Sequence, residues 1–193
     1  MNINNVNQTN FGANFINNVT IKKFDYKAHQ YKPFKASFVQ FDPKNKEDFA
    51  AMVGAVKTWK GEDYASTIVD YANRLRTNYL SPKIHRIYMV TTQQDTFDKL
   101  EKSKILGMVQ MHSDSIDPDE IRYLQVKPDQ KHGNKEREFR LVGSKILSSI
   151  KKIYNEKITL LASYSAANFY EKHGFTITEP DLLEYEWVNK KKP

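Results

Sequence analysis

The stretch SYSAANFYEKHGF, residues 163–175, is the most informative segment of this 193-residue chain. Serines stand at its start, where hydroxyls can cap a helix, and Gly174 stands where a left-handed residue ends one. The phenol of Tyr170 can donate or accept a proton. The alternative is that Phe169, Tyr170 and Phe175 are all core aromatics. The segment predicts a short, closely packed helix with Tyr170 as its candidate for chemistry.

Strand and helix patterns flank this segment on both sides. Residues 158–162 (ITLLA) form a short apolar run that is typical of a strand buried on both faces. Residues 182–188 (LLEYEWV) alternate and predict a final strand. Between Val142 and Tyr154, apolar side chains recur at helical spacing, which predicts an amphipathic helix. The segment is therefore expected to follow a helix and a strand, in that order, and to precede one more strand.

The earlier part of the chain continues this alternation. Short or β-rich runs predict strands at 36–41, 85–93, 104–113 and 120–128. Two helices are expected between the first two of these strands, one beginning at Asp42-Pro43 and one near Glu62. The order is β-α-α-β-β-β-α-β-α-β. This order predicts an α/β domain with a mixed sheet that is antiparallel in its middle.

Composition excludes several classes of protein. The chain has no cysteine, which excludes disulfide scaffolds, thiolate zinc sites and cysteine nucleophiles. This composition fits a reducing compartment, and we expect a cytoplasmic location. No apolar run approaches the ~18 residues of a membrane span. The first 20 residues lack the pattern of a secretory signal, and no cluster with metal-ligand spacing is present.

The net charge of +7 is carried by the two ends of the chain. Residues 1–35 hold five lysines against one aspartate, residues 190–192 are three lysines, and residues 36–189 are neutral overall. This distribution argues against a nucleic-acid partner for the central part. We expect three parts: an asparagine-rich flexible arm at 1–34, a folded domain at 35–189 and a basic tail at 190–193.

A second informative segment joins a strand to a helix. The predicted strand ends in VKP at 126–128, a polar loop follows, and a helix opens in FRLVGSK at 139–145. The first N–H groups of a helix lack internal partners, and Gly143 lets a ligand approach the backbone closely. Such a helix start can bind an anion of the pyrophosphate kind. The alternative is that Gly143 serves packing alone.

Taken together, the two segments resemble the GNAT superfamily of acyl-CoA-dependent N-acyltransferases. The resemblance runs from about Lys35 to Trp187 and depends most on FYEKHGF at 169–175. It implies a three-layer fold with a central mixed, mostly antiparallel sheet flanked by helices. It also implies acetyl-CoA as cosubstrate and no metal. In the family's helix-start pattern, Q/R-x-x-G-x-G/A, Glu138 replaces the first residue and Leu141 the first glycine.

The resemblance also implies which residues bind the coenzyme. Strand backbone at 124–126 would pair with the pantetheine arm, and the helix start would meet the phosphates. Ser163 replaces the asparagine that the family usually carries. The implied coenzyme-binding residues are Leu124, Gln125, Val126, Arg137, Glu138, Phe139, Arg140, Leu141, Val142, Gly143, Ser144, Ser163 and Asn168.

For the reaction, the resemblance implies direct attack of a primary amine on the thioester in a ternary complex. A lysine-like amine has a pKa of about 10.4, so a base must remove a proton. Glu120 lies at the place where some family members carry a catalytic glutamate, although a surface carboxylate is the alternative. His112 and Tyr123 are lesser candidates for this base. Tyr170 matches the tyrosine that protonates the departing thiolate.

Two other functions stay open on the same fold. One is a catalytically degenerate acyl-CoA-binding protein, suggested by the departures at Glu138 and Leu141. The other is a nucleic-acid-binding module, suggested by the basic ends. The early helices and loops, which hold the amine acceptor in this family, carry no diagnostic pattern here.

Overall fold

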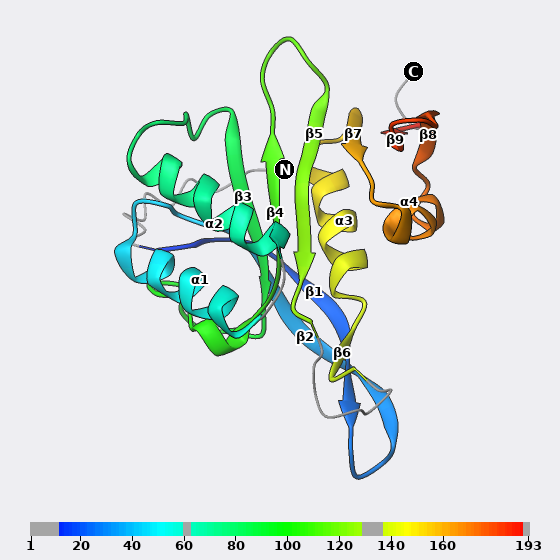
Figure 1. Ribbon diagram of the computed structural model, residues 1–193. Helices are drawn as coiled ribbons and strands as arrows, with labels where there is room; N and C mark the ends of the chain where they lie inside the picture. Colours follow the sequence, from blue (N-terminus) through cyan, green and yellow to red (C-terminus); the bar gives the residue numbers. More distant parts are fainter. Residues whose placement is uncertain (1–11, 60–62, 129–136, 191–193) are drawn as a thin grey trace, which may run out of the picture.

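The structure is a computed structural model that describes residues 12–59, 63–128 and 137–190 (Figure 1). Its helices are α1 (Lys46–Thr58), α2 (Asp63–Arg76), α3 (Val142–Ile153) and α4 (Ala167–Lys172). Its strands are β1 (Asn14–Asp25), β2 (Gln30–Gln40), β3 (His85–Thr91), β4 (Ile105–His112), β5 (Asp119–Val126), β6 (Phe139–Arg140), β7 (Lys157–Leu161), β8 (Thr176–Glu179) and β9 (Glu184–Val188).

All these strands join one sheet in the order β6-β1-β2-β3-β4-β5-β7-β9-β8. Every neighbouring pair is antiparallel except β5 and β7, which run parallel. Helices α1 and α2 cover one face, and α3 and α4 cover the other (Figure 1). The prediction of a three-layer α/β fold with a mixed, mostly antiparallel sheet is therefore confirmed.

The central strands are buried on both faces, so the sheet separates two apolar cores. On β3, Tyr88 and Val90 pack beneath α3, whereas Ile87 and Met89 pack beneath α1 and α2. Successive strand residues point to opposite faces, so a nearly continuous apolar run fills both cores. This explains why the central strands carry so many β-branched and aromatic side chains.

The N-terminal segment differs from the expected flexible arm. Residues 14–25 and 30–40 pair along their length as an antiparallel hairpin, so residues 14–34 belong to the folded domain. Val19 and Ile21 alternate with polar residues and are buried. This period-two pattern was hidden by the surrounding asparagines. Residues 1–11 of the expected arm and 191–193 of the expected basic tail lie outside the described residues.

The start of α1 also differs from the prediction. The helix begins at Lys46, and its N-cap is Asn45 rather than Asp42. The Asn45 side chain accepts hydrogen bonds of 2.9 Å from the backbone N–H groups of Glu47 and Asp48. Asp42 instead accepts from the Lys44 N–H in the preceding turn. Asparagine and aspartate are comparable caps, so the sequence pattern did not separate them. No described helix is both long and apolar enough to cross a bilayer.

Candidate active site

The site lies where the parallel neighbours β5 and β7 separate. Only residues 119–121 of β5 pair with β7, which ends at Leu161, while β5 continues to Val126. Lys127 donates its backbone N–H to Leu106 of β4 at 2.8 Å. Backbone groups of successive residues in an antiparallel strand alternate in direction, so the N–H groups of Leu124 and Val126 point away from β4. They face the gap beside β7, where an extended ligand can pair with them.

A β-bulge in β5 decides which face of the sheet its side chains occupy. The register with β4 shifts at Arg122, since Tyr123 pairs with Gln110 while Ile121 pairs with Met111. Strict alternation along an unbroken strand would place Ile121 and Leu124 on opposite faces. The extra residue reverses the alternation, so Ile121 and Leu124 both belong to the core under α3.

The first cavity lies at the start of α3 and measures about 540 Å³. The N-cap of this helix is Leu141, in the left-handed conformation with φ 70° and ψ 7°. A non-glycine residue pays a steric cost there, which explains the glycine that the family pattern places at this position. The next N–H groups open the helix and lack carbonyl partners within it. The cavity is lined by Leu124, Val126, Arg137, Phe139, Arg140, Leu141, Val142, Gly143, Ser144 and Phe169.

Gly143 also permits close packing between α3 and α4. A Cβ atom at this position would lie 3.1 Å from the Phe169 ring and 3.5 Å from Val126. Phe169 therefore sits against bare backbone and forms a wall of the first cavity. The packing interpretation of Gly143 is therefore supported, and the approach of a ligand to its backbone stays a prediction.

A second cavity, of about 230 Å³, holds both candidate catalytic residues. It lies between β5, the end of β7, α2 and α4. Leu124 lines both cavities, so they meet at this residue. The second cavity is lined by Tyr64, Glu120, Ile121, Arg122, Tyr123, Leu124, Leu161, Ser163, Ala166 and Tyr170.

Tyr170 is held by the short helix α4. The helix ends as predicted at Gly174, whose φ is 76°. The N–H groups of Gly174 and Phe175 donate to the carbonyls of Glu171 and Tyr170, which is a Schellman ending. Burial raises the pKa of Tyr170 to about 12, and the nearby Tyr64 phenol adds to the shift. The phenol stays protonated at neutral pH and can act as a proton donor in the cavity.

Glu120 lies near the start of β5, between His112 of β4 and Thr159 of β7. Arg122 Nε donates to Glu120 Oε2 at 2.8 Å. The Glu120 side chain remains 22% exposed, so the carboxylate is accessible from the second cavity.

His112 and Tyr123, the lesser candidates for the catalytic base, lie in different places. Tyr123 lines the second cavity, but His112 does not. His112 Nε2 lies 3.2 Å from Asp114 Oδ2, and its Nδ1 is buried without a hydrogen-bond partner among the described residues. The His85 ring packs 4.8 Å from that of His112, measured between centroids. His112 is therefore held beside the strand end rather than in the cavity.

Most of the predicted coenzyme residues come together around the first cavity. Ser163 lies instead in the second cavity. Gln125 lines neither cavity and donates its amide to the Val126 carbonyl at 2.9 Å. Glu138 and Asn168 also lie outside both, with Asn168 exposed on α4.

The sequence analysis missed Tyr64 and Phe169 as site residues. Tyr64 lies near the start of α2 and recurs at helical spacing with the apolar residues of that helix, a pattern typical of a core position, but it is 46% exposed. Its ring lies 5.7 Å from that of Tyr123 across the second cavity. Phe169 was considered only as a possible core aromatic, and its approach to Gly143 depends on tertiary packing. Among the described residues, no group of three or more His, Asp or Glu side chains could hold a metal ion.

Comparison with known proteins identifies the fold. No family model and no curated protein sequence matches the chain. A structure from Desulfovibrio desulfuricans, assigned as an acetyltransferase of the GNAT family, superimposes with a TM-score of 0.54 at 10% identity, covering 79% of this chain and 98% of that one. An assigned acetyltransferase from Exiguobacterium sp. 255-15 gives 0.53 at 12% identity, covering 79% and 93%.

An acetyltransferase from Thermus thermophilus gives a TM-score of 0.50 at 12% identity, covering 79% of this chain and 95% of that one. The agreement extends over nearly the whole length of each of these structures. At these identities the likeness concerns the fold. This chain has the fold of the GNAT superfamily.

Proposed function

We propose that this protein is an N-acetyltransferase that transfers the acetyl group of acetyl-CoA to a primary amine. One observation carries the proposal: two cavities meet at Leu124, one at the start of α3 and one containing Glu120 and Tyr170. An anion site and a pair of proton-transfer groups are thus joined along one strand edge. The GNAT fold supports acyl transfer in general.

The coenzyme occupies the first cavity and the gap beside β5. Its pyrophosphate meets the N–H groups that open α3, with Arg137 supplying positive charge. Its pantetheine arm extends along Leu124 and Val126, whose N–H groups face the gap. The thioester then lies at the second cavity, within reach of the Glu120 and Tyr170 side chains that line this cavity.

The transfer proceeds by direct attack in a ternary complex. Glu120 accepts a proton from the amine, directly or through water, and the nitrogen lone pair attacks the thioester carbonyl carbon. The new oxyanion is stabilised by a backbone N–H of β5. The C–S bond then breaks, and Tyr170 donates its proton to the departing thiolate. The remaining extra proton on the attacking nitrogen passes to the Tyr170 phenolate, directly or through water, which leaves a neutral amide. Because the chain contains no cysteine, an acyl-cysteine intermediate is excluded.

Two measurements on the full chain test this proposal. Acetyl-CoA at millimolar concentration should raise the melting temperature, because it binds the native state. Release of the free thiol from acetyl-CoA should accelerate with at least one member of a broad amine panel. Absence of any melting shift would count against coenzyme binding, and hence against the proposal as a whole.

Glu120→Gln tests the base. The acidic limb of the pH dependence of kcat/KM should disappear in this variant, because the glutamine cannot be protonated. Asp119→Asn, on the neighbouring residue, is the matched control and should keep the limb. An unchanged acidic limb in Glu120→Gln would remove Glu120 from the mechanism.

A coenzyme-binding protein without turnover is the second candidate function. It is favoured by the ion pair between Glu120 and Arg122, which already engages the carboxylate. Tight binding of acetyl-CoA with no thiol release across the amine panel would establish this alternative. Release with any amine would exclude it.

A further inference from the structure

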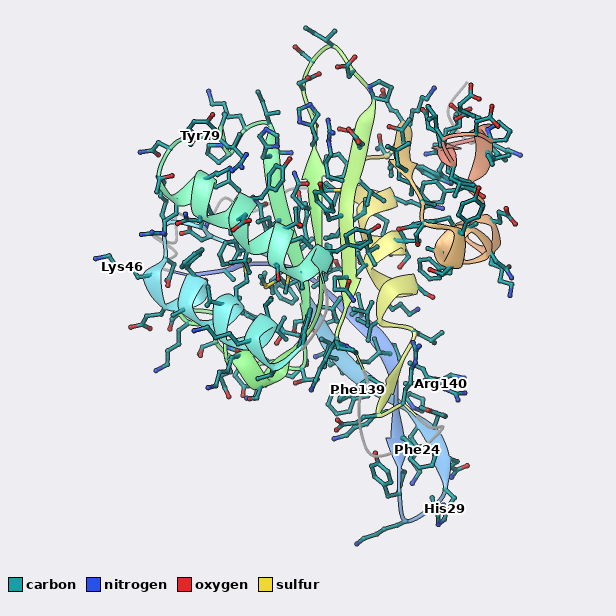
Figure 2. All side chains as sticks on the ribbon, in the orientation of Figure 1. Phe24, His29, Lys46, Tyr79, Phe139 and Arg140 are labelled. Atoms are coloured by element: carbon teal, nitrogen blue, oxygen red, sulfur yellow. The ribbon has the colours of Figure 1, made fainter. Side chains whose placement is uncertain are left out.

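The β1–β2 hairpin extends beyond the rest of the sheet and carries the short strand β6 on its edge (Figure 1). In β6, Phe139 pairs with Lys23 and Arg140 pairs with Lys22. Figure 2 shows both β6 side chains beside the hairpin, which bears Phe24 along its length and His29 at its turn. Because β6 ends immediately before Leu141, the hairpin fixes the chain that leads into the first cavity.

Two hydrogen bonds fasten the backbone before β6 to the hairpin. The Phe24 N–H donates to the Glu138 carbonyl at 2.8 Å. The Tyr31 hydroxyl donates to the Arg137 carbonyl at 2.6 Å. These bonds hold residues 137 and 138, which have no regular partner of their own, against the neighbouring strands.

The side chains of β6 are held on both faces of the strand. The Arg140 guanidinium lies over the Tyr31 ring, 4.0 Å from its centroid. On the other face, Phe139 packs against Phe34 with centroids 5.8 Å apart, and Lys23 Nζ lies 5.5 Å from the Phe139 ring. Successive strand residues point to opposite faces, so side chains of the hairpin contact Arg140 on one face of β6 and Phe139 on the other.

The charged side chains where β6 borders the first cavity favour binding of an anion. Arg137 and Arg140 line the first cavity, and neither has a carboxylate partner within 4 Å among the described residues. Lys23 Nζ lies 4.0 Å from the Glu138 carboxylate and offsets its charge. At 4.0 Å from the Tyr31 ring centroid, the guanidinium carbon of Arg140 is within cation–π distance. The guanidinium N–H donors, which lie in the plane, remain available to a phosphate.

We propose that Arg140 binds the ribose 3′-phosphate of coenzyme A and that Tyr31 is its positioning residue. The inference rests on the proposed function, in which the helix start holds the pyrophosphate and the β5–β7 gap holds the pantetheine arm. The nucleotide end must then leave the cavity on the opposite side, where β6 runs onto the hairpin. The 3′-phosphate is the group of the coenzyme that reaches this side with an uncompensated charge.

The test compares coenzyme A with dephospho-coenzyme A, which lacks only the 3′-phosphate. Titration calorimetry on the full chain gives the dissociation constant of each ligand. We expect the wild-type protein to bind coenzyme A about tenfold tighter, since one charge-assisted contact is worth that order. Arg140→Gln and Tyr31→Leu should both bring the ratio of the two constants close to one. Binding of dephospho-coenzyme A should change by less than about twofold in either variant.

Two control variants separate positioning from general effects. Tyr31→Phe keeps the ring beneath Arg140 and should keep most of the discrimination between the ligands. Lys27→Gln removes a charge near the hairpin turn, where the side chain is exposed and lies outside both cavities, and should also keep it. Melting temperatures verify that the variants are folded. Arg140 is exposed, so Arg140→Gln tests the site even if Tyr31→Leu unfolds.

Three results would overturn the inference. Equal binding of both ligands by the wild-type protein would refute the 3′-phosphate site while leaving the proposed function intact. An equal loss in Lys27→Gln and Arg140→Gln would indicate general electrostatic attraction in place of a defined contact. Failure of the wild-type protein to bind either ligand would refute the proposed function itself, and this inference with it.

Discussion

Tyr170 combines burial with access to the second cavity. A phenol is protonated at neutral pH even at its ordinary pKa of about 10, and burial raises the pKa of Tyr170 to about 12. The side chain therefore carries a proton that a thiolate formed beside it can accept. Tyr170→Phe should lower kcat by about 10²-fold or more, the usual contribution of a positioned proton donor. The dissociation constant for acetyl-CoA should change little, because the ring is kept. Full turnover across the pH range in this variant would refute the general-acid role.

Leu141 adopts a backbone conformation that disfavours its side chain. Leu141→Gly should raise the free energy of unfolding by about 1 kcal/mol, since glycine reaches a φ of 70° without steric cost. For a chain of this size that corresponds to a gain of roughly 2–4 °C in melting temperature. Leu182→Gly is the matched control at an exposed leucine without positive φ and should lower stability. A lower melting temperature for Leu141→Gly would contradict the inference that the backbone conformation of Leu141 is strained.

At the scale of single elements, the contact between α3 and α4 shapes the coenzyme cavity. Gly143→Ala should weaken acetyl-CoA binding several-fold, because its Cβ would push against the Phe169 ring at 3.1 Å. Phe169→Leu in the same chain should restore part of the loss by making room. The four dissociation constants form a double-mutant cycle. Additive effects in that cycle would show that the two residues are not coupled.

At the same scale, the residue pattern of each strand decides whether it could be predicted from the sequence. The strands over 85–91, 105–112 and 119–126 were expected because their buried faces demand dense β-branched and aromatic residues. Strand β1 was missed because its apolar alternation spans only a few residues within an asparagine-rich stretch. The bulge at Arg122 depends on the register between two strands, which no local pattern contains.

In the candidate site, too, features set by a local sequence pattern could be predicted, and features set by tertiary contacts could not. Tyr170 and the start of α3 could be predicted because each lies within one short, distinctive segment. The hairpin contacts with β6 join residues more than 100 positions apart, as in the bond from Tyr31 to Arg137. Such pairings arise from the sheet order, so the segment that was expected to be a flexible arm proved to be part of the site's support.

At the scale of the whole molecule, Asp48 links α1 to the connection between β3 and β4. It is fully buried and accepts a 2.7 Å hydrogen bond from the Leu100 N–H, while Oδ2 has no partner among the described residues. Burial raises its pKa to about 6. The unfolded carboxyl has a pKa near 3.9, so between these values the folded protein holds a proton that the unfolded chain has lost.

The contribution of Asp48 to stability therefore falls as pH rises from about 4 to 6 and is constant above that range. Between pH 6 and pH 5 the wild-type protein should gain about 1 kcal/mol relative to Asp48→Asn, which does not titrate. Urea unfolding of both proteins at several pH values measures this difference. Parallel stability curves would show that Asp48 ionises normally in the folded state.

The lysines near the N-terminus lie in the folded domain, whereas the sequence predicted that most of them belong to a flexible arm. The five lysines of residues 1–35 lie on the hairpin and its continuation into β2, beside the proposed phosphate site. The excess charge thus belongs to the folded domain at this end of the chain. It is placed to attract an anionic coenzyme as it approaches.

The central claim is that acetyl-CoA binds along β5 at the separation from β7 and at the start of α3. Amide hydrogen exchange of the full chain, with and without acetyl-CoA, tests this claim most directly. We predict slower exchange at Leu124 and Val126 and at Val142 to Ser144, because these N–H groups become hydrogen-bonded to the ligand. Unchanged exchange at both segments under saturating acetyl-CoA would contradict the account.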